Sequence, residues 1–364
     1  MQITAAVVRE RSSRFLLETL DIDGPRDDEV LVRIVGVGIC HTDLAGRDGH
    51  LPVPFPAVFG HEGAGIVERV GSGVRKVQPG DHVVCTWSYC GACAACRSGR
   101  YAYCEDFFLH NFHGARPDGS TCLRGAAGPV HGSFFSQSSF ADHALARERN
   151  VVKVASDAPL EQLAPLGCGV STGVGAVLNA LHPAAGSSIA VFGVGTVGLS
   201  AVMASVLCGC TTIVAVDAKP ERLEAARRLG ATHSVNVATE DPVPRILAIC
   251  PGGVEFSLEC VGNPRVLRPA VDVLRRLGEC GLVGVVPPRT EITLDMEFLM
   301  NGRSVRGILE GDAVPDIFIP RLVRLHDQGK LPFSDLVTFY RLDEINTAVA
   351  DMEQGRVIKP VLRP

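Results

Sequence analysis

The first half of the chain carries the pattern of short strands. Val30–Val37 is an apolar, β-branched run, and a further strand from His82 follows the turn Val-Gln-Pro-Gly-Asp at 77–81. Glycines divide this region into short segments, at Gly63, Gly65, Gly71, Gly73 and Gly80. Because β-branched runs between turn residues are typical of strands, we predict a β-rich barrel with irregular loops up to about residue 160.

After about residue 170 the pattern changes to alternating strands and helices. The predicted strands are Ile189–Phe192, Thr212–Val216, Val254–Leu258 and Gly281–Val286. The predicted helices are Thr196–Leu207, Pro220–Leu229 (ended by Gly230) and Val266–Leu277. Strands and helices that alternate at this spacing form right-handed βαβ units, so we predict an α/β domain with a doubly wound parallel sheet. From about Ile308 a mixed pattern returns, and we expect this tail to rejoin the first half.

Composition narrows the functional classes. The chain has 364 residues, 35 Lys and Arg against 40 Asp and Glu, and 46% hydrophobic residues. This length suffices for two domains with their own cores. A net charge of -5 offers no basic surface, so we expect no nucleic-acid partner. High apolar content with a small net charge also excludes a disordered chain.

We expect a cytoplasmic protein without a membrane partner. Met1–Ser13 holds no apolar core of signal-peptide length. Pro183–Val216 contains no charged residue and is longer than the ~20 apolar residues that span a bilayer. Five glycines interrupt it, however, and a nucleotide-binding turn explains their placement better than a membrane helix does.

Four of the 13 cysteines lie within 15 residues, as Cys90, Cys93, Cys96 and Cys104. The spacing Cys-x2-Cys-x2-Cys-x7-Cys allows the four thiolates to converge on one tetrahedral centre, which suits structural zinc. An iron–sulfur cluster uses similar ligands. Since all four positions are filled, no coordination site is left for a substrate, and we predict a structural metal.

A glycine-rich turn follows the predicted strand Ile189–Phe192 and begins a helix. Its glycines are Gly193, Gly195 and Gly198, and we include Val197 inside the motif among the cofactor contacts. The glycines permit a tight turn, close approach of a pyrophosphate, and helix–strand packing. Asp217 ends the next strand 19 residues after Gly198. An acidic residue there binds the adenosine ribose hydroxyls and repels a 2′-phosphate, which favours NAD over NADP.

Several segments together resemble the zinc-dependent medium-chain alcohol dehydrogenase family over essentially the whole chain. Besides the cysteine cluster and the glycine turn, they are Gly38-Ile39-Cys40-His41-Thr42-Asp43, Gly60-His61-Glu62-Gly63-Ala64-Gly65 and Leu166-Gly167-Cys168-Gly169. The resemblance implies a GroES-like β-barrel catalytic domain formed by residues 1–170 and 309–364. It also implies a Rossmann-type dinucleotide-binding domain formed by residues 171–308.

The resemblance further implies a second, catalytic zinc on Cys40, His61 and Cys168, so that each chain holds two zinc ions. Two thiolates and one imidazole are the ligand set known for alcohol dehydrogenase, and they leave the fourth position open. The spacing alone does not reveal this site, because the ligands lie 21 and 107 residues apart. Asp43 is similar to the carboxylate that orients the ligand histidine, and Glu62 to a carboxylate that approaches the metal during ligand exchange.

Thr42 matches the family's hydroxyl that starts the proton relay. The histidine that the family often has five positions after the first ligand cysteine is Ala45 here, so either His41 or an ordered water must accept the proton. Four residues are similar to cofactor contacts of the family. They are His41 and Lys359 (pyrophosphate), Arg222 (adenosine ribose) and Thr172 (nicotinamide ring).

Within the family, the middle section and the missing relay histidine resemble the bacterial aryl-alcohol (benzyl alcohol) dehydrogenases. This implies reversible oxidation of primary aromatic or allylic alcohols to aldehydes with NAD. The alternative within the family is S-(hydroxymethyl)glutathione dehydrogenase, although the short, mostly apolar stretch Gly46–Phe59 lacks the acidic insertion usual there. A structural, dinucleotide-binding protein without catalysis is the alternative from another class. The resemblance also implies a homo-oligomer built through the cofactor domains, with a tetramer favoured over a dimer.

Overall fold

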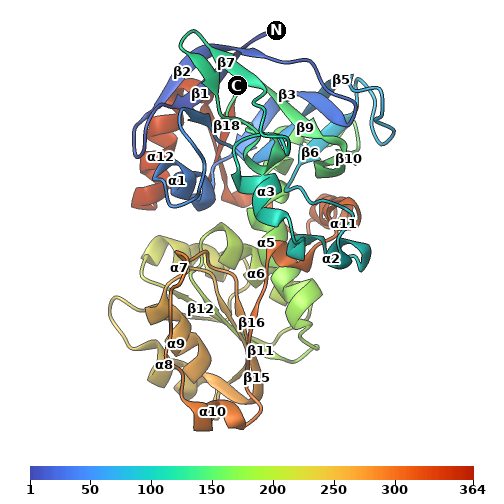
Figure 1. Ribbon diagram of the computed structural model, residues 1–364. Helices are drawn as coiled ribbons and strands as arrows, with labels where there is room; N and C mark the ends of the chain where they lie inside the picture. Colours follow the sequence, from blue (N-terminus) through green and yellow to red (C-terminus); the bar gives the residue numbers. More distant parts are fainter. The chain divides into compact units, whose positions relative to one another are not determined.

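The computed structural model describes all residues from Met1 to Pro364, and they form two compact units (Figure 1). The first unit contains Met1–Cys168, Val314–Leu325 and Ser334–Pro364. The second contains Gly169–Ala313 and His326–Phe333. The first unit is therefore assembled from both ends of the chain.

Two sheets form the first unit. One has the strand order β4-β1-β2-β7-β8, and the other has the order β10-β6-β5-β3-β18-β17, with β9 paired to β3. The strands are β1 (Gln2–Val8), β2 (Phe15–Ile22), β3 (Glu29–Gly38), β4 (Ala57–Val58), β5 (Glu62–Val70), β6 (His82–Cys85), β7 (Leu123–Gly125), β8 (Gly128–Val130), β9 (His143–Arg147), β10 (Val151–Val154), β17 (Val337–Arg341) and β18 (Lys359–Arg363). The predicted β-rich first half is confirmed, including the strands at Val30–Val37 and from His82.

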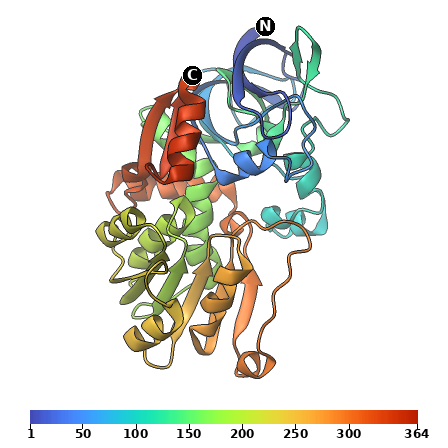
Figure 2. The same ribbon diagram turned by 90° about the vertical axis from the view of Figure 1, so that its left-hand side faces the viewer.

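Short helices fill the connections of this unit. They are α1 (His41–Arg47), α2 (Ala94–Arg97), α3 (Phe107–Phe112), α4 (Leu160–Leu163), α11 (Pro315–Asp327) and α12 (Ile345–Gln354). Near the end of the chain, β18 pairs antiparallel with β3 through Val361↔Gly38 and Leu362↔Val37. Helix α12 packs against β17 and β18, and these C-terminal segments lie together in Figure 2. Most of the tail from Val314 onward therefore lies in the first unit as expected, whereas the residues up to Ala313 and the segment His326–Phe333 belong to the second unit.

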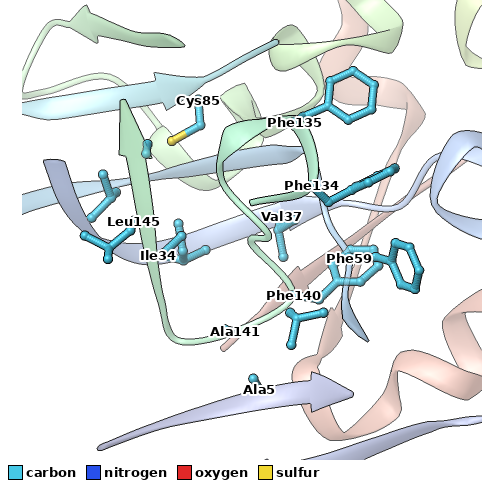
Figure 3. Close-up of a cluster of buried hydrophobic side chains, with 14 of the residues drawn as sticks. Ala5, Ile34, Val37, Phe59, Cys85, Phe134, Phe135, Phe140, Ala141 and Leu145 are labelled. Carbon is cyan, nitrogen blue, oxygen red and sulfur yellow. The ribbon is translucent and has the colours of Figure 1, made fainter. Parts of the chain in front are cut away.

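Aromatic side chains concentrate in the core of the first unit. Phe59, Phe134 and Phe140 are completely buried, and the ring of Phe134 meets that of Phe59 edge-on at 5.2 Å. Figure 3 shows Phe134 and Phe135 projecting from one loop of this core. Each fully buried phenylalanine contributes about 1.5–3 kcal/mol relative to an exposed one, so this cluster holds the loop firmly in place.

The second unit contains one parallel sheet of six strands in the order β13-β12-β11-β14-β15-β16. These are β11 (Ser188–Phe192), β12 (Thr212–Asp217), β13 (His233–Asn236), β14 (Val254–Glu259), β15 (Leu274–Leu282) and β16 (Ser304–Gly307). Its helices are α5 (Gly169–Gly175), α6 (Thr196–Leu207), α7 (Pro220–Arg228), α8 (Pro242–Ile249), α9 (Pro264–Asp272) and α10 (Met296–Met300). The strand order reverses between β11 and β14, and ligands of such sheets bind beyond the carboxyl ends of the strands at that point. The predicted doubly wound sheet is confirmed.

One pair of predicted elements in this unit is misplaced. The helix predicted over Val266–Leu277 ends at Asp272, and the strand predicted over Gly281–Val286 already begins at Leu274 and ends at Leu282. Leu274 is buried and pairs with Val254. The apolar residues here also fit a helical period, but pairing with β14 places them in a strand. Beyond Leu282 the backbone leaves the sheet, because the N–H groups of residues 283 and 284 both bond to the carbonyl of Glu259.

No single helix is long and apolar enough to span a membrane. Only the bent pair of helical stretches Leu160–Gly167 and Gly169–Leu181 passes that test of length and composition, and it does so as a pair.

Candidate functional site

The first unit brings Cys40, His61 and Cys168 together. Their ligand atoms and a carboxylate oxygen of Glu62 all lie within 4.8 Å of one another. Cys40 immediately precedes α1, and His61 immediately precedes β5. The Nε2 atom of His61 is buried and has no hydrogen-bond partner. Because a buried, unpartnered nitrogen is costly, its position beside two thiols fits a metal ion. Two thiols and one imidazole are suitable for zinc and leave one coordination position open.

Asp43 orients this cluster from α1. Its carboxylate is completely buried and accepts hydrogen bonds from His61 Nδ1 (2.8 Å), Gly60 N (3.0 Å) and Cys40 N (2.9 Å). Since Nδ1 faces a carboxylate, this nitrogen carries the proton, and Nε2 is left to act as a ligand. The predicted contact between Asp43 and His61 is therefore present in the structure.

The thiol of Cys40 is prepared for metal binding. A hydrogen bond from Cys168 is the largest influence on it and, with the nearby charges of His61 and Lys359, holds the pKa of Cys40 well below its usual value although burial opposes this. A thiolate is the form that ligates metals. Thr42 Oγ1 lies 3.7 Å from Cys40 Sγ, so the hydroxyl predicted to start the proton relay lies beside the cluster. His41 is the first residue of α1, next to Thr42.

Glu62 forms a buried ion pair with Lys359. The Lys359 ammonium lies 2.9 Å and 3.0 Å from the two carboxylate oxygens and also donates to the carbonyl of Ile39 at 3.0 Å. Burial raises the pKa of Glu62, and the lysine charge opposes this rise. The sequence predicts that Lys359 contacts pyrophosphate, whereas the structure places its ammonium against Glu62, where β18 lies beside β3. Sequence reasoning missed this pair, because only the strand register reveals it.

A second cluster comprises Cys90, Cys93, Cys96 and Cys104, whose sulfur atoms lie within 4.8 Å of one another. Backbone N–H groups of Ala92 and Cys93 donate to the sulfur of Cys90, each at 3.3 Å. Cys93 caps α2 by accepting from the N–H of Cys96, and such bonds lower the pKa of the Cys93 thiol to about 6. Four converging sulfurs with backbone donors can hold a metal with closed tetrahedral coordination.

The glycine turn in the second unit connects β11 to α6. Gly193 has a φ of +85°, and Gly195 is the N-terminal cap of α6, with Val197 in the first turn of that helix. A side chain at Gly198 would meet the carbonyl oxygen of Gly193 at 2.0 Å, so only glycine permits this close packing. The arrangement leaves backbone N–H groups at a helix N-terminus, which suits a phosphate.

Asp217 ends β12 beside this turn. Its carboxylate accepts from the N–H groups of Val194 (2.9 Å) and Lys219 (3.0 Å). Arg222 Nη1 lies 3.8 Å from the Asp217 carboxylate. The Nε atom of Arg222 is buried without a hydrogen-bond partner. Thr172, in α5, donates to the carboxylate of the buried Glu310 at 3.3 Å, a residue that sequence reasoning did not single out. Gly193, Asp217 and Arg222 thus lie at the carboxyl ends of adjacent strands or just beyond them.

Comparison with known families and proteins gives one consistent result. The family described as "Alcohol dehydrogenase GroES-like domain" matches residues 26–156, and "Zinc-binding dehydrogenase" matches residues 196–325. The chain is 45% identical to the geraniol dehydrogenase of Castellaniella defragrans over 98% of this chain and 96% of that protein.

Two solved structures are similar over the full length. An alcohol dehydrogenase zinc-binding domain protein from Burkholderia ambifaria is 53% identical, with a TM-score of 0.98, and the match covers 100% of this chain and 99% of the other. The benzyl alcohol dehydrogenase of Acinetobacter calcoaceticus is 48% identical, with a TM-score of 0.96 and the same coverage.

Proposed function

Because the chain belongs to the zinc-dependent medium-chain alcohol dehydrogenase family, we propose that it oxidises primary aromatic or allylic alcohols of the benzyl alcohol type to aldehydes. Hydride passes reversibly from the alcohol carbon to NAD. The observation that carries this proposal is the cluster of Cys40, His61 and Cys168 with a buried, unpartnered Nε2 and Thr42 beside it. This cluster offers three ligands and one open position.

We assign zinc to both clusters. A zinc ion on Cys40, His61 and Cys168 would polarise the alcohol oxygen as a Lewis acid. Thr42 then accepts the hydroxyl proton through its Oγ1 and passes it toward His41 or an ordered water, because Ala45 provides no base. Asp43 keeps Nδ1 of His61 protonated throughout, which holds Nε2 in the ligating form. Cys90, Cys93, Cys96 and Cys104 would hold the second, structural zinc.

The cofactor is NAD, bound by the second unit. The glycine turn before α6 suits the pyrophosphate, and the Asp217 carboxylate suits ribose hydroxyls while repelling a 2′-phosphate. We assign residues 1–170 and 309–364 to the catalytic domain and 171–308 to the dinucleotide-binding domain. The two compact units support this division at its main boundaries, which differ from it by only a few residues, but the segment His326–Phe333 belongs to the second unit.

Aromatic neighbours of His61 support an apolar alcohol. The Phe135 ring stacks on the His61 ring at 4.3 Å, the Phe134 ring meets it edge-on at 5.6 Å, and Phe112 meets Phe135 at 5.1 Å. These rings are buried core residues that exclude water from the side of His61 they cover, and an apolar site of this kind suits aromatic or allylic groups better than the charged glutathione adduct of S-(hydroxymethyl)glutathione dehydrogenase. The similarity to a geraniol and a benzyl alcohol dehydrogenase supports the same substrate class.

We also propose that the chain forms a homo-oligomer, with a tetramer favoured, through its second unit. Strand β16 ends the parallel sheet and has β15 as its single neighbour. Leu277, Met296 and Met300 in the same unit are about four-fifths exposed. An exposed sheet edge near large apolar side chains favours pairing with a second copy.

The proposal is tested by NADH absorbance at 340 nm with zinc-loaded protein. Benzyl alcohol, geraniol, ethanol, and formaldehyde with glutathione are supplied in parallel. We expect benzyl alcohol or geraniol to exceed ethanol; activity confined to formaldehyde with glutathione would instead favour the glutathione-dependent enzyme. Thr42→Val tests the proton relay, because valine keeps the shape of the threonine side chain and lacks its hydroxyl. We expect turnover to fall about 100-fold or more while the zinc content stays unchanged. Inactivity with all four substrates at two zinc ions per chain would refute the proposal.

A further inference from the structure

The side-chain amide of Gln137 makes all of its hydrogen bonds to groups around His61. Its Oε1 accepts from Gly63 N (3.1 Å) and from Ser139 Oγ (2.6 Å). Its Nε2 donates to the carbonyls of His61 (2.9 Å) and Thr86 (3.1 Å). Gln137 is only 2% exposed, so no water competes for these bonds. The amide therefore binds the backbone on both sides of Glu62, at the carbonyl of His61 and at the N–H of Gly63.

This amide lies where two paired strands separate. Strands β5 and β6 pair up to Ala64↔Val84, and the same register would continue with Gly63 opposite Cys85 and then Glu62 opposite Thr86. Those rungs are absent, and Gln137 Nε2 bridges the gap by binding the carbonyls of His61 and Thr86 at once. A side chain therefore takes the place of the backbone hydrogen bonds between β5 and β6 beside the candidate ligand His61.

Thr86 extends the connection to another candidate ligand. Its hydroxyl donates to the carbonyl of Gly167 at 2.7 Å, and Gly167 immediately precedes Cys168. A side chain at Gly167 would meet the carbonyl oxygen of Cys85 at 2.3 Å, so the chain approaches β6 too closely for any other residue. Two of the three candidate ligands are thus tied through one amide and one hydroxyl.

The loop that carries Gln137 is strained. Four non-glycine residues of this loop have left-handed backbone angles, namely Ser133 (+61°), Phe135 (+51°), Ser136 (+52°) and Ser138 (+53°). Each such residue costs on the order of 1 kcal/mol, so the surrounding contacts must fix the loop. Asn150 supplies part of them by donating to the carbonyls of Phe135 (3.2 Å) and Ser136 (3.3 Å).

Two side chains of the strained loop contact His61. Gln137 binds its carbonyl, and Phe135 stacks on its ring at 4.3 Å with an interplanar angle of 21°. Strained backbone lowers the stability of the fold, so its presence beside a candidate ligand indicates that the loop conformation serves the site.

We propose that Gln137 is a positioning residue for the catalytic metal. It fixes the peptide of His61 and, through Thr86, the peptide before Cys168, so that the ligand atoms converge before a metal binds. The proposal rests on the proposed function, because it takes Cys40, His61 and Cys168 as the metal ligands. The four hydrogen bonds of the Gln137 side chain all go to protein groups, so it would act through the backbone of the ligands.

The test measures zinc release from the holoenzyme into a chelator. Gln137→Met keeps the length of the side chain and removes its four hydrogen bonds. We expect one zinc per chain to leave about 10- to 100-fold faster than in the wild type, with the other zinc unaffected, since supporting partners of metal ligands have effects of this size. His61→Ala identifies which zinc belongs to the catalytic cluster, and cobalt replacement should show an altered visible spectrum for that site in Gln137→Met.

Asn346→Leu is the matched control. Asn346 binds the N–H and carbonyl of Phe15 with its amide, at 3.1 Å and 2.9 Å, and contacts neither metal cluster. This variant should lose stability without faster zinc release. If Gln137→Met does not fold, Thr86→Val replaces it, because this variant loses only the bond to Gly167. Thr86→Val should release the catalytic zinc several-fold faster, and Thr86→Ser should restore the wild-type rate.

The outcomes separate the two proposals. Wild-type protein that holds zinc only on the four-cysteine cluster would overturn the proposed function. Wild-type protein with two zinc ions, and variants that release the catalytic zinc at the wild-type rate, would overturn only the positioning role of Gln137.

Discussion

The buried pair of Glu62 and Lys359 allows a quantitative prediction. Glu62 is completely buried and Lys359 is 2% exposed, so neither charge is solvated by water. Lys359→Met keeps the aliphatic length and removes the ammonium, which leaves the Glu62 carboxylate without its partner. Removing one member of a buried pair typically costs about 3–5 kcal/mol, because the remaining charge is uncompensated.

The pH dependence follows from the protonation of Glu62. Burial already raises the pKa of Glu62, and removal of the lysine charge raises it further. The folded variant then keeps a proton that the unfolded chain releases, so its free energy of unfolding falls relative to that of the wild type as the pH rises above the pKa of Glu62 in the wild type. Protonating such a carboxyl costs about 3.4 kcal/mol at pH 7 and about 1.4 kcal/mol at pH 5.5. We therefore expect Lys359→Met to be destabilised more at pH 7 than at pH 5.5, by up to about 2 kcal/mol for one proton.

The assay is urea unfolding of zinc-loaded protein, followed by the fluorescence of Trp87. This is the only tryptophan of the chain, and it is buried in the first unit, so it reports on the unit that contains the pair. The control is the double variant Glu62→Gln/Lys359→Met, which removes both charges. It should be more stable than Lys359→Met at pH 7 and should show no additional loss between pH 5.5 and pH 7. A deficit of Lys359→Met that is equal at both pH values, or equal to that of the double variant, would refute the reasoning.

Two further predictions concern the cofactor and the proton relay. Asp217→Ser should raise kcat/KM with NADP relative to NAD, because it removes the carboxylate at the end of β12 that repels a 2′-phosphate, and an unchanged ratio would contradict the cofactor assignment. His41→Gln should lower turnover most strongly at low pH if His41 receives the proton from Thr42, and an unchanged pH profile would assign that step to water instead.

The parts of the candidate site that could be predicted from the residues themselves are local in sequence. The four-cysteine cluster and the turn from Gly193 to Gly198 each lie within 15 residues, so spacing alone indicates their geometry. Cys40, His61 and Cys168 are far apart, and only the resemblance to a family connected them. The structure brings these residues together, as described above.

Other contacts could not be predicted, because they depend on strand register. Lys359 reaches Glu62 across 297 residues, and Gln137 reaches His61 across 76. Nothing in the sequence around Gln137 distinguishes a buried amide that binds the backbone of His61 from an ordinary polar residue in a loop. The misplaced strand β15 has the same origin, since apolar residues from Val273 to Leu277 fit both a helix and a strand until pairing with β14 decides.

The surroundings of His61 and Glu62 show how the first unit assembles a metal site from distant segments. Asp43 on α1 fixes the His61 ring nitrogen, Gln137 on a strained loop fixes the His61 peptide, and Lys359 on β18 balances the charge of Glu62. Each residue acts on a different group, so none of them can replace another. Because β18 joins its sheet through pairs with β3 and β17, the charge balance beside the candidate ligands depends on the last strand of the chain. Loosening of that strand should therefore disturb both Glu62 and Cys40, since Lys359 binds the Glu62 carboxylate and Ile39, the residue before Cys40, bonds to Lys359 and to the carbonyl of Pro360.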